Sequence, residues 1–83
     1  MYKVYLIDTY EVEPNKVQIG EFEDLEEAKK FVEKMYNHFM AESGDFFDLD
    51  IEKDGKLIYS KGRFFGSEKV YDNGEYKIEK LKF

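Results

Sequence analysis

The residues best suited to chemistry are a run of carboxylates that begins at position 48. Asp48, Asp50 and Glu52 alternate with apolar residues, and an Asp-Gly pair follows them. Counted from Asp50, these residues fill positions one, three, five and six of a calcium-binding loop of the EF-hand type. Position twelve is Lys61 instead of a bidentate glutamate, and the flanking segments alternate as strands where the loop requires helices. The run therefore does not predict a calcium site.

The same carboxylates can form a charged stripe on one face of a strand. Side chains two residues apart on a strand lie about 6.6 Å apart, whereas a nucleic-acid strand carries a phosphate about every 3.4 Å. Nucleic-acid mimicry would therefore need a second acidic row. The residues available for that row are Asp8, Glu11, Glu13, Glu21 and Glu23. Two interpretations stay open: a mimic of a phosphate row, or the solvent-facing side of an antiparallel sheet.

A second candidate is the aromatic pair Phe64-Phe65, which follows Arg63, the single arginine of the chain, and is bracketed by Gly62 and Gly66. Aromatic residues and arginine are enriched in the hot spots of protein interfaces. Adjacent residues of an extended segment point in opposite directions, so only one of the two phenylalanines can readily lie inside, and the other is available for contact with a partner. We predict partner contacts at Asp48, Asp50, Glu52, Arg63, Phe64 and Phe65.

Catalytic and cofactor motifs are not found in the sequence. The chain has no cysteine and a single histidine, His38, which lies at the border of the apolar face of the predicted helix. A histidine in that position is typical of a structural residue, and no nucleophile, paired base or phosphate-binding loop accompanies it. We expect a protein that is not an enzyme and that has no catalytic residues, no cofactor and no metal.

One amphipathic helix is predicted from Asp24 to Gly44. Asp24 is a suitable N-cap, Glu27 completes the capping-box spacing, and Gly44 can end the helix in the left-handed conformation. One half of this helix is apolar. Its apolar residues are Leu25, Ala28, Phe31, Val32, Met35, Tyr36, Phe39 and Met40.

The rest of the chain has the period of strands. Residues 2–13 and 17–22 predict a hairpin with a turn at Pro14 and a bulge at Gly20. Strands at 47–52 and 56–61 are expected to pair through a three-residue turn, with Glu52 opposite Lys56, Ile51 opposite Leu57 and Leu49 opposite Tyr59. A loop at 62–67 and a final hairpin of 68–72 and 75–83 complete the chain.

These elements predict a single α+β domain over residues 1–83. Its strands and helix follow the order ββαββββ and form one antiparallel sheet packed on one α-helix. Such a helix is about 27 Å long and 10 Å wide, and the sheet is roughly 19–24 Å across. The helix is therefore too narrow to cover the sheet unless the sheet curls around it.

Composition limits the partners. The net charge of −6, from 19 acidic and 13 basic residues, argues against direct binding of nucleic acid. No apolar run is long enough to cross a membrane or to form a signal sequence, and the lack of cysteine favours the cytoplasm.

We expect a small acidic protein-interaction module that occupies a basic surface on a nucleic-acid-binding protein. Inhibitors made by phages and mobile elements, including anti-CRISPR proteins, are of this type. The alternative is a small structural domain that forms a homodimer or larger homo-oligomer through its uncovered sheet face. The residues expected at that contact are Tyr5, Ile7, Ile58 and Tyr71.

Overall fold

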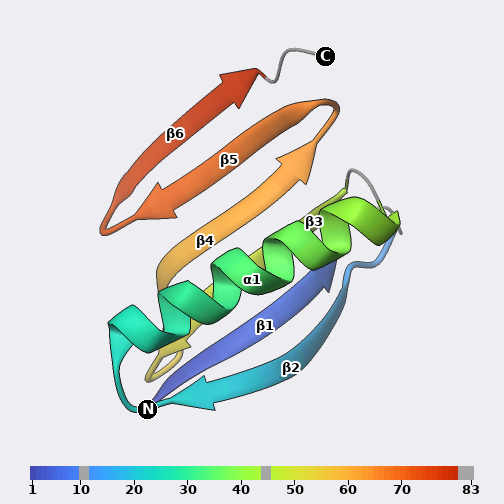
Figure 1. Cartoon of the computed structure of the whole chain (residues 1–83). Coiled ribbons are helices and arrows are strands. Elements are labelled where there is room, and N and C mark those ends of the chain that lie inside the picture. Colours follow the sequence, from blue (N-terminus) through green and yellow to red (C-terminus); the bar gives the residue numbers. More distant parts are fainter. Residues whose placement is uncertain (10–11, 44–45, 81–83) are drawn as a thin grey trace.

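The computed structural model describes residues 1–9, 12–43 and 46–80, which form one antiparallel sheet with a helix on one face (Figure 1). The strands are β1 (Tyr2–Asp8), β2 (Asn15–Phe22), β3 (Phe47–Lys53), β4 (Lys56–Phe64), β5 (Ser67–Asp72) and β6 (Glu75–Lys80), and the helix is α1 (Leu25–Ser43). They lie in the order β2-β1-β3-β4-β5-β6. The predicted α+β class and element order are confirmed.

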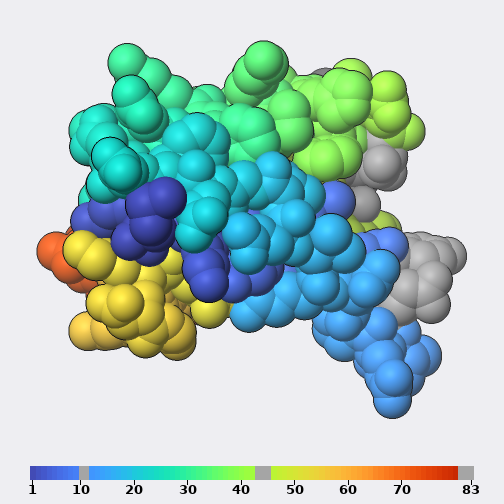
Figure 2. Space-filling model, turned by 90° about the horizontal axis from the view of Figure 1, so that it is seen from below, coloured from blue at the N-terminus to red at the C-terminus, as the bar shows by residue number. Residues whose placement is uncertain are grey.

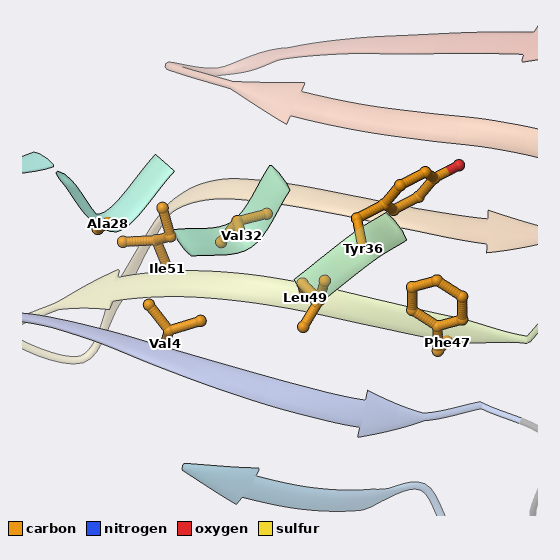
Figure 3. Close-up of a cluster of buried hydrophobic side chains, with 7 residues drawn as sticks. All are labelled: Val4, Ala28, Val32, Tyr36, Phe47, Leu49 and Ile51. Carbon is orange, nitrogen blue, oxygen red and sulfur yellow. The ribbon is translucent and has the colours of Figure 1, made fainter. Parts of the chain in front are cut away.

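The core lies between α1 and the strands β1 and β3 (Figure 3). Phe47, Leu49 and Ile51 alternate along β3 and point toward the helix, as their spacing predicts. The other buried side chains of the core are Val4 from β1 and Ala28, Val32 and Tyr36 from α1. Full burial of a side chain such as leucine or isoleucine contributes about 1.5–3 kcal/mol.

The helix leaves β5 and β6 uncovered, because it packs on β1 to β4 (Figure 1). Two long side chains reach from α1 to β5: Tyr36 donates to Glu68 over 3.0 Å, and Lys29 Nζ lies 3.4 Å from Asp72. Every residue of β6 is exposed. The expectation that one helix cannot cover the sheet is confirmed.

The first hairpin is shorter than predicted. β1 ends at Asp8 instead of Glu13. The bulge is present, since Val4 is opposite Gly20 and the following pair is Tyr5 with Gln18, which leaves Ile19 as the extra residue. The start of α1 directly after Asp24 agrees with the predicted N-cap, whereas Gly44 lies outside the described residues.

The predicted register of β3 and β4 is wrong. The turn has two residues, Asp54 and Gly55, with φ of 53° and 76°, and it places Lys53 opposite Lys56. An Asp-Gly turn of this type matches the right-handed twist of the strands, which outweighs the small cost of two exposed lysines facing each other.

A bulge then resets the pairing of β3 with β4. Glu52 is opposite Leu57, and the next pair is Ile51 with Tyr59, so Ile58 is the extra residue. The bulge turns the Tyr59 side chain to the helix side, where it packs against the core. The predicted pairs of Glu52 with Lys56, Ile51 with Leu57 and Leu49 with Tyr59 are therefore not formed.

The predicted loop at 62–67 is also wrong. β4 continues through Gly62 and Arg63 to Phe64, and a two-residue turn of Phe65 and Gly66 leads directly into β5. The φ angles of that turn are 49° and 73°.

Candidate protein interface

The sheet face opposite α1 is open over the residues that the structure describes. Figure 2 shows the helix (green) on one side of the sheet, while the β1–β2 hairpin tip (blue) and the β3–β4 turn (yellow) extend on the other side. β3 and β4 are the two central strands of the sheet. Side chains of β3 that point away from the core therefore lie in the middle of this open face.

The acidic stripe, which we define as Asp48, Asp50 and Glu52, lies on this face. All three residues are half-buried, and each carboxylate has a partner from another strand. The contacts are Asp48 with Lys69 Nζ at 3.8 Å, Asp50 accepting from Ser60 Oγ at 2.6 Å, and Glu52 with Lys16 Nζ at 2.5 Å. The stripe is therefore a paired, partly desolvated row.

Partial burial raises the pKa of two carboxyl groups of the stripe. The pKa of Asp48 is raised by desolvation, which the nearby Lys69 only partly offsets. The pKa of Asp50 is raised by desolvation first and also by the charges of Asp48 and Glu52, against the hydrogen bond from Ser60. Ionised at neutral pH, both groups oppose folding.

Asp50→Asn is expected to increase the free energy of unfolding at pH 7 by about 0.5–1 kcal/mol. The amide oxygen can still accept from Ser60 without carrying a charge. The pKa of Asp50 in the folded protein lies above the ordinary value of 3.8. The ionised aspartate therefore destabilises the fold, and this loss of stability develops as the pH rises from the ordinary pKa through the folded-state pKa. Urea unfolding should show the gain at pH 7 and none near pH 2.5, and an equal gain at both pH values would contradict the electrostatic cause.

Gly62 makes room for Asp48. A Cβ at position 62 would lie 1.8 Å from Asp48 Oδ1 and 2.6 Å from the backbone oxygen of Phe47. The Asp48 side chain lies across the β4 backbone at this point and approaches Lys69 of β5. The glycine thus serves a close approach inside a strand, which is why its interpretation as part of a bend is wrong.

An aromatic cluster, which we define as Phe46, Phe64 and Phe65, lies at the end of the acidic stripe. Its ring centroids are 4.4 Å apart for Phe64 and Phe65, 4.9 Å for Phe46 and Phe65, and 5.6 Å for Phe46 and Phe64. Phe64 is 42% exposed and Phe65 is 71% exposed, so neither ring lies in the core. Lys69 Nζ, which approaches Asp48, also lies 5.5 Å from the Phe64 ring centroid. The two regions that the sequence indicates separately are therefore adjacent.

The backbone of the aromatic cluster is unusual. Phe46 has a φ of 73° and Phe65 a φ of 49°, a region that is rare for bulky residues. In the β3–β4 and β5–β6 turns, the position equivalent to Phe65 holds Asp54 and Asn73, and aspartate and asparagine tolerate a positive φ. Phe65 therefore departs from the local preference while its ring remains exposed, and such departures concentrate at functional sites.

Phe46 is the residue that sequence reasoning missed. Its signal was the pair Phe46-Phe47 at the start of β3, because only one of two adjacent aromatic residues can follow the inward alternation of Phe47, Leu49 and Ile51.

Arg63 does not accompany the aromatic cluster on the open face. It is opposite Phe47 on the helix side of the sheet, is 8% exposed, and donates to Met40 Sδ over 2.7 Å. A partner on the open face has no access to this guanidinium. Its predicted place on an exposed bend is wrong, because the strand continues through it.

Lys61 lies beside Arg63 in a polar layer between β4 and α1. Its Nζ is 2.6 Å from both carboxylate oxygens of Glu33 and 4.4 Å from the ring centroid of Tyr36. Burial, and then the hydrogen bond to Glu68, raises the pKa of Tyr36 to about 12. These charges are balanced within the fold, which indicates a structural role.

Other chemistry finds little support in the described part of the chain. His38 is exposed on α1, with Nε2 3.8 Å from Glu42. Over residues 1–9, 12–43 and 46–80, no group of three or more histidine, cysteine, aspartate or glutamate side chains is arranged to hold a metal ion. In the same residues, no helix is long and apolar enough to cross a membrane.

Comparison with known proteins gives no match, whether with protein-family models, with curated sequences or with solved structures.

Proposed function

We propose that this chain is a protein-interaction module that binds a basic protein surface through the open face of its sheet. The observation that carries the proposal is that Lys69 links the aromatic cluster, in which Phe64 and Phe65 are exposed, to the partly desolvated carboxylate of Asp48. Aromatic rings provide anchors in interfaces, and charged groups beside them set orientation and specificity.

Phe65 supports an anchoring role for the aromatic cluster because its ring is 71% exposed in the free protein. Phe65 contacts Phe46 and Phe64 and is otherwise largely exposed to water. Burial of an aromatic ring removes roughly 150–250 Å² from water. A partner with an apolar pocket at this position can therefore bury most of the ring surface that folding leaves exposed.

The acidic stripe supports a cationic partner. Asp48 is desolvated, yet the cation that pairs with it in the described residues, Lys69 Nζ, is 3.8 Å away, beyond the distance of a close charge-assisted hydrogen bond. A lysine or arginine of the partner could approach the carboxylate more closely and offset its desolvation. The net charge of −6 would attract such a surface from a distance.

A protein surface fits this face better than mimicry of a phosphate row. Across β2, β1 and β3, Glu21, Lys3 and Glu52 are in register, so charges of opposite sign alternate where mimicry needs a second acidic row. The partner class we propose remains a nucleic-acid-binding protein, contacted at a basic surface. The specific role we propose is that of a phage or mobile-element inhibitor of the anti-CRISPR type. We propose that it acts in the cytoplasm, because the chain has no cysteine and so needs no oxidising compartment.

Asp48→Asn is expected to weaken capture of the partner from a host lysate by about tenfold at low salt, through loss of a charge contact in the interface. Glu42→Gln is the matched control, because it removes the same charge from an exposed position on α1. Wild-type capture should decrease as salt increases. Capture that is equal for the two variants, or unchanged between low and high salt, would count against the proposal.

A further inference from the structure

Within the part of the chain that the structure describes, β6 is an unprotected edge of the sheet. It pairs with β5 in a regular register without a shift, and all of its residues are exposed, including Tyr76 at 70% and Ile78 at 68%. The opposite edge, β2, is interrupted by the bulge at Ile19, and α1 contacts this strand. Bulges and covering helices are the devices that protect edges, so the two edges differ in their capacity to add a strand.

The two-residue turn between β5 and β6 determines which backbone groups of β6 point to the free edge. Asp72 and Glu75 flank the two-residue turn and form its hydrogen-bonded pair. Hydrogen-bonded and non-hydrogen-bonded pairs alternate along an antiparallel ladder. The N–H and C=O groups of Tyr76, Ile78 and Lys80 therefore point to the free edge, where a further strand can bind them.

We propose that this edge binds β6 of a second copy of the chain, antiparallel and centred on Ile78, so that the sheet continues through both copies. A two-fold axis at Ile78 places Ile78 opposite itself and Tyr76 opposite Lys80 of the partner. These are the residues whose backbone groups point outward, so the ladder and the two-fold symmetry agree.

The side chains of β6 are self-complementary in this register. Lys77 falls opposite Glu79 of the partner, and Glu79 opposite the partner's Lys77, on the side of the sheet that carries α1. On the open face, Ile78 meets its copy, and Lys80 lies beside the aromatic ring of Tyr76. A register centred on Lys77 would instead place lysine opposite lysine and Glu75 opposite Glu79. Charge thus disfavours that register. A register centred on Tyr76 would also bring opposite charges together, Glu75 with Lys77, but it would pair only residues 75–77 of each β6, so the register centred on Ile78 combines opposite charges with the longer contact.

The first test uses single cysteines, which the chain otherwise lacks. Opposed residues of a hydrogen-bonded pair have Cα atoms about 5.5 Å apart, within the range of a disulfide. Ile78→Cys is expected to give mostly a covalent dimer on mild oxidation. Tyr76→Cys is the matched control and should stay mostly monomeric, because position 76 faces position 80. Equal cross-linking of both variants, or none at position 78, would overturn the proposed register.

The second test exchanges charges without altering the core. Lys77→Glu is expected to increase the dimer dissociation constant by about tenfold, because it places two glutamates opposite each other at each end of the contact. The double variant Lys77→Glu/Glu79→Lys should restore the wild-type value. Light scattering over a concentration series measures the constant. A strictly monomeric wild type, or a double variant as weak as the single one, would refute the dimer. Because these residues lie outside the aromatic cluster and the acidic stripe, the result of this test does not decide the proposed function, which the capture experiment tests separately.

Discussion

Gly62→Ala is expected to lower the free energy of unfolding by about 3 kcal/mol or more. The new methyl group would lie 1.8 Å from Asp48 Oδ1 and 2.6 Å from the backbone oxygen of Phe47. The Asp48 side chain can rotate away, although it then leaves Lys69. The backbone oxygen cannot move without distorting the pairing of the central strands β3 and β4. Urea unfolding at pH 7 measures the loss.

Gly55→Ala is the control for that measurement. Gly55 has a φ of 76° but no atom within 4 Å of an added Cβ, so only the backbone conformation disfavours alanine. A loss of about 1 kcal/mol is expected there. If Gly62→Ala costs no more than Gly55→Ala, Gly62 does not serve the close approach of Asp48.

Phe65→Asn is expected to reduce affinity for the partner by a factor of about 30 or more, as for an interface hot spot. Its effect on folding should be small, because two contributions offset each other. Asparagine suits the left-handed position of the turn, which favours the variant by about 1 kcal/mol. Loss of the ring contacts with Phe46 and Phe64 opposes this by a similar amount, about 0.5–1.5 kcal/mol.

Titration calorimetry with the captured partner and urea unfolding of the free chain separate these two effects of Phe65→Asn. Val17→Asn is the control, since Val17 is an exposed apolar residue of β2 outside the aromatic cluster. A Phe65→Asn variant that unfolds easily, or that binds like the wild type, would contradict the proposed role of the ring.

Local sequence signals were sufficient for the elements and the core. The helix begins after Asp24, and the inward residues of β3 are Phe47, Leu49 and Ile51, as their periods predict. Both patterns depend on residues that are near one another in sequence, where the helical and strand periods act directly.

Features that depend on neighbouring strands could not be predicted in the same way. Gly62 has the local signature of a bend, but its purpose is a contact with Asp48, fourteen positions earlier in the sequence. Arg63 is buried because the strand continues, and the turn after it has a phenylalanine where asparagine or aspartate would be typical. The acidic stripe was recognised from the sequence, whereas its partners and its link to the aromatic cluster through Lys69 depend on the order of the strands.

We propose that partners bind the open face of the sheet at the aromatic cluster and the acidic stripe. The most direct test of this proposal is an NMR titration of the isotope-labelled chain with the unlabelled partner, observing aromatic and carboxyl side-chain signals. We predict that the largest changes occur at the rings of Phe46, Phe64 and Phe65 and at the carboxyl groups of Asp48 and Asp50. Changes confined to outward-facing carboxyl groups of α1, such as those of Glu26, Glu27 and Glu42, would contradict this proposal.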